Sequence, residues 1–188
     1  MSGSLRGQFL IAGKRLRDPN FYRTVVLMVE HGDEGAMGLV VNRPSSIGVA
    51  HALSEHFHLP ETEDMVHIGG PVEPSALFIL HTAHELDESE TSVVPGLFVG
   101  SSADAFENIV RSAAAGDESM RYRIFSGCAG WGPEQLEGEI ARGDWYVSPA
   151  AADLVFDSDP YDLWDTLLAK VFEAKRILPH RCKNPEWN

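Results

Sequence analysis

A tryptophan set among glycines at the start of a helix constrains this chain more than any other feature of its sequence. The stretch reads SGCAGWGPEQLEGEIARGDW over residues 126–145. Gly132 is expected as the N-cap and Pro133 as the first helical residue, where the missing N–H of proline costs nothing. Trp131 and Leu136 then have the spacing of a hydrophobic staple. The pattern therefore predicts a tight turn and a helix start at one defined place.

The residues after this turn specify the rest of the helix. Gln135 is in position to bond back to the cap, and Gly143 follows the last turn as a typical C′ residue. A strand at residues 122–125 leads into the glycines. Under this interpretation Trp131 fills the core beneath the glycines, and the alternative is a lid that stacks on a ligand. The structural role is favoured.

The glycine spacing also invites a phosphate-binding interpretation, since Gly127, Gly130 and Gly132 lie between a strand and a helix. The spacing is not GxGxxG, however. Glu134 and Glu137 in the first helical turns would repel a phosphate from the positive end of the helix dipole. A structural turn is therefore favoured over a phosphate site.

Apolar runs separated by turn residues predict the remaining elements. Strands are expected at residues 7–12, 24–30, 36–42, 66–68, 76–81, 97–99, 144–147 and 154–156. Helices are expected at residues 49–57, after Ser101 with its capping-box spacing to Asp104, and from Asp159 and Pro160 onward. The second and third strands read as a hairpin. Neighbouring strands with few scattered helices favour an α+β fold with a mixed, mostly antiparallel sheet.

Length and composition limit the organisation of the chain. A chain of 188 residues can bury roughly 70 % of its unfolded surface in one core. We expect a single domain over residues 1–175 and a flexible tail over residues 176–188. The acidic segment at residues 85–92 is expected to be a mobile surface loop.

The net charge of −13, from 28 acidic and 15 basic residues, argues against direct binding of nucleic acid. The apolar run near the N-terminus is too short for a signal peptide, and no later run is long enough to span a membrane. We therefore expect a cytoplasmic protein with no membrane association.

Cysteines and histidines give no signature of a disulfide, metal or cofactor site. The two cysteines, Cys128 and Cys182, form no CxxC pair. Cys128 is interpreted as a small buried hydrophobe rather than a nucleophile. The close histidine pairs are His56 with His58 and His81 with His84, and neither matches a zinc pattern.

A polar cluster ends the second strand of the hairpin. Asn42 and Arg43 precede a proline, which holds Arg43 extended at the rim of a buried strand. A half-buried arginine normally has a carboxylate partner, and Glu30 is the expected one. The alternative is a bidentate clamp for a small anion, helped by the backbone of Gly69 and Gly70.

Three motifs together resemble the bacterial AlgH-like (YqgE) family. They are RDPNFYRTVVLMVEHGDEGAMGLVVNRP at residues 17–44, GGPV at 69–72 and SGCAGWGPEQLEGEI at 126–140, with LVFD at 154–157. The resemblance covers roughly residues 5–172. It implies one α+β domain whose branched sheet curls into a pseudo-barrel with helices outside. The biochemical function of the family is largely undefined, and some members carry the label of transcriptional regulator. Cys128 departs from the residues common in the family at its position.

Two classes of function stay open. The favoured one is a non-enzymatic protein with a regulatory or interaction role, acting on an unknown protein or small-molecule partner. The alternative is a small-molecule enzyme, for example a hydrolase, with a cleft between the Glu30–Arg43 hairpin and the Trp131 glycines. An enzyme should bring several titratable groups into one pocket, whereas an interaction protein should present a patch without them.

Overall fold

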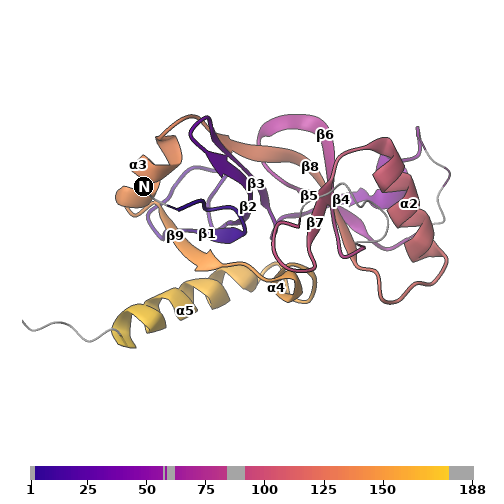
Figure 1. Cartoon of the computed structure of the whole chain (residues 1–188). Helices are drawn as coiled ribbons and strands as arrows, with labels where there is room; N and C mark the ends of the chain where they lie inside the picture. Colours follow the sequence, from indigo (N-terminus) through magenta and orange to yellow (C-terminus); the bar gives the residue numbers. More distant parts are fainter. Residues whose placement is uncertain (1–2, 57, 59–61, 84–91, 178–188) are drawn as a thin grey trace, which may run out of the picture.

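One branched sheet organises the molecule, and both halves of the chain contribute strands to it (Figure 1). The computed structural model describes residues 3–56, 58, 62–83 and 92–177. The strands of this part are β1 (Gln8–Ala12), β2 (Val25–Gly32), β3 (Gly35–Val40), β4 (Pro44–Gly48), β5 (Met65–Ile68), β6 (Val72–His81), β7 (Phe98–Gly100), β8 (Tyr122–Trp131) and β9 (Trp145–Pro149). Its helices are α1 (Val49–Ala52), α2 (Ala103–Ala114), α3 (Gln135–Ala141), α4 (Ala152–Phe156) and α5 (Leu163–Ile177).

The strand order is β4-β5-β8-β3-β2-β1-β9, and the branch arises at β8. The first part of β8 pairs with β5 and β6, whereas its last residues pair with β3. The β5–β8 pairing is parallel, and the other pairings of the described strands are antiparallel. The predicted α+β class with a mixed, mostly antiparallel, branched sheet is confirmed.

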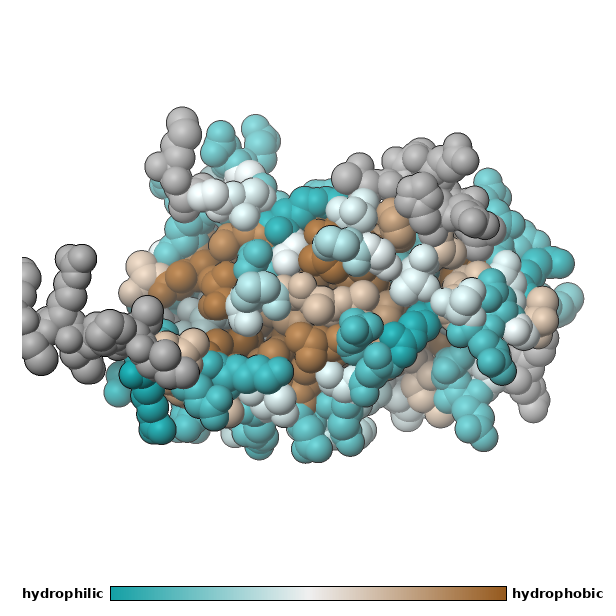
Figure 2. Space-filling view, turned by 60° about the horizontal axis from the view of Figure 1, so that its bottom comes forward, coloured by the Kyte–Doolittle hydropathy of each residue, from teal (hydrophilic) through white to brown (hydrophobic). Residues whose placement is uncertain are grey.

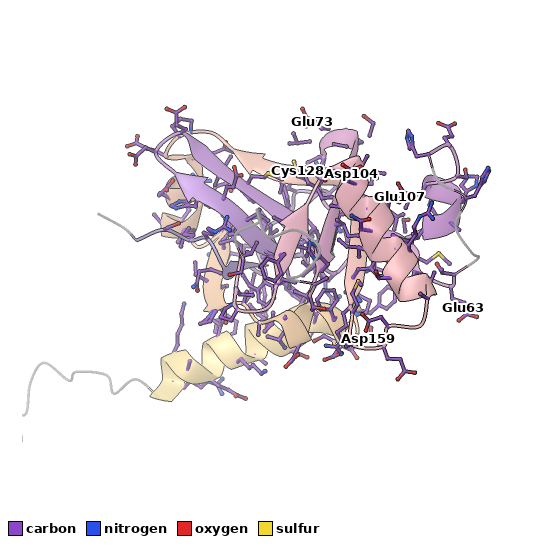
Figure 3. The ribbon with its side chains drawn as sticks, turned by 45° about the vertical axis from the view of Figure 1, so that its right-hand side comes forward. Glu63, Glu73, Asp104, Glu107, Cys128 and Asp159 are labelled. Atoms are coloured by element: carbon purple, nitrogen blue, oxygen red, sulfur yellow. The ribbon has the colours of Figure 1, made fainter. Side chains whose placement is uncertain are left out.

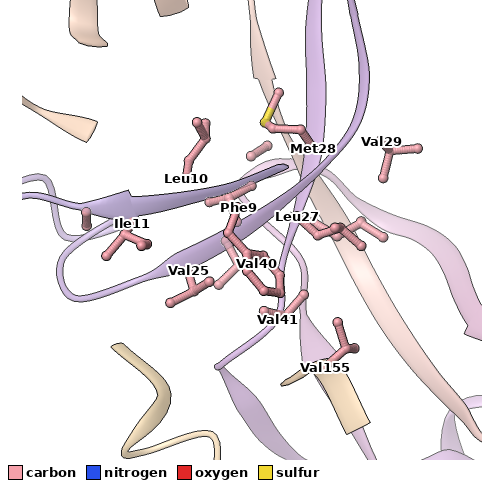
Figure 4. Close-up of a cluster of buried hydrophobic side chains, with 14 of the residues drawn as sticks. Phe9, Leu10, Ile11, Val25, Leu27, Met28, Val29, Val40, Val41 and Val155 are labelled. Carbon is pink, nitrogen blue, oxygen red and sulfur yellow. The ribbon is translucent and has the colours of Figure 1, made fainter. Parts of the chain in front are cut away.

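The sheet is curled, as the expected pseudo-barrel requires. It is not closed into a barrel, because β4 and β9 at its two ends are not paired with each other in the described part of the chain. Strands β1, β2 and β3 form the predicted hairpin and its neighbour, and their side chains are buried on both faces. Figure 4 shows this packing, in which Phe9, Leu27 and Val40 lie in the middle of the cluster.

Two hydrophobic clusters lie on the sheet. The larger one packs β1, β2, β3 and β9 against α3, α4 and α5. The smaller one packs α1 and α2 against β5, β6 and β8, at the other end of the molecule. Helix α2 is the helix predicted after Ser101, and its residues Phe106, Ile109 and Val110 are buried in this cluster. Its cap is Ser102, whose hydroxyl accepts from the amide of Ala105, one residue later than the predicted Ser101.

Several predicted elements need correction. The strand expected at residues 154–156 is part of helix α4, because this short apolar run buries Val155 against the core without pairing to a strand. Of the helix expected at residues 49–57, the part that the structure describes (residues 49–56) is helical at Val49–Ala52 only. The strand expected at residues 122–125 continues through the glycines to Trp131.

The C-terminal helix extends beyond its expected end. Helix α5 begins at Leu163, three residues after the predicted start at Pro160, and it follows a turn in which a side-chain oxygen of Asp159 accepts from the amide of Tyr161. It continues to Ile177, past the expected start of the tail at residue 176. The rest of that tail, and residues 85–91 of the expected mobile loop, lie outside the described residues. None of the described helices is long and apolar enough to cross a membrane.

Candidate functional site

Trp131 lies in a cluster of three aromatic rings at the α3 end of the molecule. Its indole stacks on Phe21 at 6.0 Å between ring centroids and meets Trp145 edge-on at 6.0 Å. Phe21 also meets Trp145 edge-on at 5.6 Å. Trp131 is only 6 % exposed and belongs to the larger core cluster. These contacts agree with its interpretation as a core residue.

A single carboxylate satisfies both indole N–H groups of this cluster. Oε2 of Glu139 accepts from Nε1 of Trp131 and from Nε1 of Trp145, each at 2.9 Å. Oε1 of the same carboxylate accepts from Nε2 of Gln135 at 3.0 Å. The charge of Glu139, which lies against Trp131 among the glycines, further disfavours the phosphate-binding alternative.

The start of helix α3 differs from the prediction by two residues. Glu134 is the N-cap, with a left-handed backbone at φ 60°, and the helix begins at Gln135. Pro133 lies in a preceding turn that the amide of Gln135 closes onto the carbonyl of Gly132 at 3.2 Å. The predicted return bond is present, since Oε1 of Gln135 accepts from the amide of Gly132 at 3.1 Å. Gly143 at the other end has the expected positive φ of 81°.

The polar cluster at the end of β3 ties the hairpin to the turn that precedes it. The side chain of Asn42 is buried and continues the hydrogen bonding of the sheet beyond β3. It accepts from the amide of Val25 and donates to the carbonyl of Arg23. Nη1 of Arg43 donates to the carbonyl of Asn20 at 2.5 Å. Nη2 donates to the carbonyls of Pro19 and Tyr22, each at 3.1 Å. Both terminal nitrogens of Arg43 therefore hold the turn at residues 19–22.

The expected ion pair between Arg43 and Glu30 is wrong. In the antiparallel register Glu30 pairs with Met37 of β3, six residues before Arg43, which follows the end of that strand. At ~3.3 Å per residue the two groups are about 20 Å apart, at opposite ends of the hairpin. Antiparallel pairing places the end of one strand beside the start of its partner. Glu30, near the end of β2, therefore lies beside the first half of β3 and far from Arg43.

Gly69 and Gly70 lie where the backbone passes very close to that of β8. The amide of Gly69 donates to the carbonyl of Ser126, and its carbonyl accepts from the amide of Val40. A Cβ on Gly70 would lie 2.2 Å from the carbonyl carbon of Cys128. Gly70 and Arg43 do line one small cavity of about 60 Å³. Because Gly69 and both terminal nitrogens of Arg43 are engaged, little of the predicted anion clamp is left to bind a ligand.

A cleft does lie between the hairpin tip and the start of α3, close to the place expected for an enzyme. Its volume is about 640 Å³, and His31, Asp33, Glu134 and Glu137 are among its lining residues. Nε2 of His31 bonds to Oε1 of Glu137 at 2.8 Å, and Nδ1 accepts from the amide of Leu5 at 3.2 Å. Both ring nitrogens of His31 are thus used to fix the N-terminal segment to α3.

A second pocket lies between β5 and β8, and several titratable side chains line it. Its volume is about 180 Å³. The polar residues that line it are Glu63, Asp64, His67, Tyr122 and Arg123. We call it the His67 pocket.

His67 is the buried member of this pocket, at 6 % exposure. Its Nδ1 lies 3.3 Å from the carbonyl of Met65 and therefore carries the ring proton. Nε2 is left as an acceptor, and it has no hydrogen-bond partner in the described part of the chain. A buried acceptor without a partner is rare in folded proteins, and each case calls for an explanation.

The electrostatics of the pocket keep this imidazole neutral. Burial, with a further contribution from the nearby Arg123 guanidinium, lowers the pKa of His67 to about 4. Arg123 is itself partly buried, and burial lowers the pKa of its guanidinium. It donates to the carbonyl of Val155 through Nη1.

Tyr122 closes the pocket on the acidic side. Its hydroxyl donates to Oδ2 of Asp64 at 2.9 Å. Burial and then the charge of Asp64 raise the pKa of Tyr122 far above its ordinary value. The phenol therefore stays protonated at physiological pH.

Other chemistry-bearing residues do not converge. Figure 3 shows Glu107 and Asp159 on separate parts of the surface, pointing away from each other. Among the residues that the structure describes, no group of three histidine, cysteine or acidic side chains could hold a metal ion. Cys128 is buried beside β6, and burial raises the pKa of its thiol, which disfavours the nucleophilic thiolate.

The His67 pocket was not predicted from the sequence, because none of Asp64, His67, Tyr122 and Arg123 belongs to a recognisable motif. One available signal was a histidine inside the apolar run at residues 65–68, where an apolar side chain is expected. The partners of His67 come from β8, more than fifty residues later, and only the parallel β5–β8 pairing brings them together.

The chain is similar to known proteins over most of its length. A model of a family described as AlgH-like matches residues 9–174. A UPF0301 protein from Myxococcus xanthus is 44 % identical over 162 residues, which cover 85 % of this chain and 86 % of the relative. A UPF0301 protein from a Marinomonas species is 37 % identical over 182 residues, covering 94 % of each chain.

Two solved structures share the fold. The solution structure of the AlgH protein from Pseudomonas aeruginosa matches with a TM-score of 0.73 at 30 % identity, covering 95 % of this chain and 96 % of that one. A crystal structure of a protein from Corynebacterium diphtheriae matches with a TM-score of 0.70 at 25 % identity, covering 90 % of this chain and 88 % of that one.

Proposed function

This chain belongs to the AlgH-like family, and we propose that it is a non-enzymatic regulatory protein of the bacterial cytoplasm that binds a small uncharged molecule in the His67 pocket. One observation carries the proposal. Nε2 of His67 is a buried acceptor without a partner among the residues that the structure describes, and the side chain lines a pocket. A ligand that donates an N–H or O–H group to this atom would satisfy it and gain a hydrogen bond in a poorly solvated place.

The charges around the pocket favour an uncharged ligand. An anion would meet the carboxylates of Glu63 and Asp64, and a cation would meet the guanidinium of Arg123. The volume of about 180 Å³ lies below the roughly 300–1,000 Å³ that is usual for ligand pockets, so the ligand must be small. A compact amide, lactam or alcohol has the required donor together with an acceptor for Arg123.

The pKa shifts favour binding over catalysis. A general base works best when its pKa lies near the operating pH, and a pKa of about 4 makes His67 a weak base at pH 7. Tyr122 is shifted in the opposite direction and is not a base either. The environment moves both groups away from the values that catalysis needs. A neutral imidazole is, by contrast, a good hydrogen-bond acceptor.

Regulation would follow from the way the ligand joins separate elements. The pocket lies between β5 and the start of β8, and Val49 of α1 also lines it. A ligand bound there stabilises this arrangement relative to conformations in which the elements separate. The resulting change would be passed on to a partner by contact. Direct binding to DNA forms no part of this proposal, because the charge of −13 opposes it.

Native mass spectrometry of protein purified from bacterial cytoplasm tests the proposal. We expect the wild type to retain a small neutral molecule that His67→Phe loses. His51→Phe is the matched control, because His51 is exposed and lies outside the pocket. A wild type without any such molecule, or a His67→Phe variant that retains it equally, would contradict the proposal.

A further inference from the structure

The ring of His31 carries an inference independent of the His67 pocket, because it joins three separate parts of the chain. It belongs to β2, and its side chain is only 7 % exposed. Nε2 lies 2.8 Å from Oε1 of Glu137 on α3. Nδ1 lies 3.2 Å from the amide nitrogen of Leu5, in the segment before β1. One titratable side chain therefore fastens the start of the chain to the hairpin and to α3.

These two contacts fix where the ring carries its proton. A backbone amide can only donate, so Nδ1 has to be the unprotonated acceptor for Leu5. Nε2 then carries the proton and donates it to Glu137. Hydrogen bonds from its own backbone amide and then from His31 lower the pKa of Glu137, so this partner is a carboxylate. The arrangement thus belongs to a neutral His31 with one defined tautomer.

A second proton on the ring would change one of the two contacts and keep the other. An imidazolium has N–H groups at both ring nitrogens, so Nδ1–H would face the N–H of Leu5. Two donors cannot bond to each other, whereas the bond from Nε2 to Glu137 gains a charge and becomes stronger. Histidine is the side chain whose charge ordinarily changes between about pH 5 and pH 8. Acidification in this range would therefore break the Leu5 contact and keep the Glu137 contact.

The surrounding charges favour uptake of this proton. A cleft of about 640 Å³ lies beside the ring, and it is lined by Asp33 from the hairpin turn and by Glu134 and Glu137 at the start of α3. Apolar side chains gather in the middle of the face in Figure 2, with hydrophilic ones around them, whereas polar and charged residues form most of this lining. On the N-terminal side, the guanidinium of Arg6 donates to backbone carbonyls of two other segments.

The attachment that would open is small and well delimited. Besides the Leu5 contact, the hydroxyl of Ser4 donates to the carbonyl of His31 at 3.3 Å, in an exposed position. At Gly7 the chain is held independently of the ring, since the Gly7 amide donates to the carbonyl of Met28 at 2.9 Å. Ser4 is one of the residues that line the cleft. Loss of the Leu5 bond therefore releases one edge of the cleft and leaves β1 in place.

We propose that His31 is a pH-sensitive switch, in which a proton on Nδ1 detaches the segment ahead of Gly7 and widens the cleft between the hairpin turn and α3. The neutral ring holds this segment in place. The charged ring stays bonded to Glu137, so the hairpin and α3 remain joined while the N-terminal side opens. Protonation of a single buried ring is thereby converted into a change in the shape of a surface cleft.

Amide and ring nitrogen NMR spectra of the full chain between about pH 8 and pH 5 test the proposal. We expect the ring shifts of a neutral His31 protonated at Nε2 at the upper end, and those of an imidazolium at the lower end. The protection factor of the Leu5 amide, which corrects for the intrinsic pH dependence of exchange, should fall at least tenfold over this range. That of the Gly7 amide should stay constant, because its bond to Met28 does not involve the ring.

Two variants separate the ring from the carboxylates around it. The side-chain amide of His31→Gln can donate to Glu137 and accept from Leu5, and it cannot take up a proton. Leu5 should therefore stay protected in this variant throughout the pH range. His51→Gln removes an exposed histidine that lies outside the cleft, and it should keep the wild-type response.

Four results would overturn the proposal. The first is a neutral His31 ring protonated at Nδ1, since Leu5 could not then donate to it. The second is a ring that stays neutral over the whole pH range. The third is a Leu5 protection factor that does not change while the ring gains its charge. The fourth is the wild-type loss of Leu5 protection in His31→Gln, which would assign the change to the acidic residues of the cleft.

Discussion

The tryptophan cluster and the His67 pocket both bury a ring nitrogen, and they differ in what that nitrogen meets. Nε1 of Trp131 and Nε1 of Trp145 converge on one oxygen of Glu139. Nε2 of His67 meets no protein partner among the described residues. The first arrangement is complete within the chain, whereas the second lacks a hydrogen-bond donor.

Whether a buried polar atom has a hydrogen-bond partner indicates its role better than the residue type does. A satisfied buried polar group stabilises one conformation, and an unsatisfied one costs about 1–3 kcal/mol that a ligand can recover. The conspicuous glycine-flanked tryptophan therefore belongs to the scaffold. The inconspicuous histidine on β5 marks the better candidate for a site.

The largest expected effect is at Trp131. Trp131→Ala removes two aromatic contacts and one hydrogen bond to Glu139, and should lower the free energy of unfolding by about 3–5 kcal/mol. Trp131→Phe keeps a ring and should cost less. Urea denaturation midpoints measure both. A loss below about 1 kcal/mol in Trp131→Ala would restore the ligand-stacking interpretation.

Arg43 tests whether a satisfied guanidinium behaves like the satisfied indoles. Arg43→Ala leaves the carbonyls of the turn at residues 19–22 without their donors and should cost about 2–3 kcal/mol, given ~1.5–3 kcal/mol for a charged hydrogen bond and partial exposure here. Arg43→Lys keeps the charge but not the fork of donors, so it should recover only part of the loss. Thermal and urea unfolding provide the measurement. An Arg43→Ala protein of unchanged stability would revive the anion clamp.

The neutral state of His67 should make stability depend on pH. The pKa is about 4 in the folded protein against an ordinary value of 6.5, so the unfolded chain binds the proton first as the pH falls. Stability is therefore full above pH 6.5 and decreases down to pH 4, with about 2 kcal/mol lost at pH 5. His67→Phe should remove this part of the pH dependence, and His51→Phe should leave it in place. Equal slopes in the wild type and His67→Phe would mean that His67 is not held neutral.

Tyr122→Phe should have the smallest effect. It removes the hydrogen bond to Asp64, which is exposed, so the expected loss is about 0.5–1 kcal/mol. Under the proposed function the same variant weakens ligand retention in native mass spectra without unfolding the protein. A loss as large as that of Trp131→Ala would place Tyr122 with the scaffold.

The prediction from sequence was strongest where the pattern is local. The apolar runs of β1, β2 and β3, the stripe on α2 and the return bond of Gln135 all follow from neighbours within a few residues. It was weakest where a short run is compatible with two structures, as at residues 154–156. It was also wrong for Glu30 and Arg43, whose relation depends on strand register.

The sequence by itself determined the fold class, the hairpin and the tryptophan-containing turn, because period, turn residues and caps act over short distances along the chain. Only the tertiary structure decided the partners of Glu139, Arg43 and His67. Each of these side chains has its environment set by residues from another element. For His67 that element is β8, and the parallel pairing that brings it alongside β5 leaves no local trace in the sequence. Hydrogen bonding depends on distances of a few tenths of an ångström, and only the packed molecule fixes those distances.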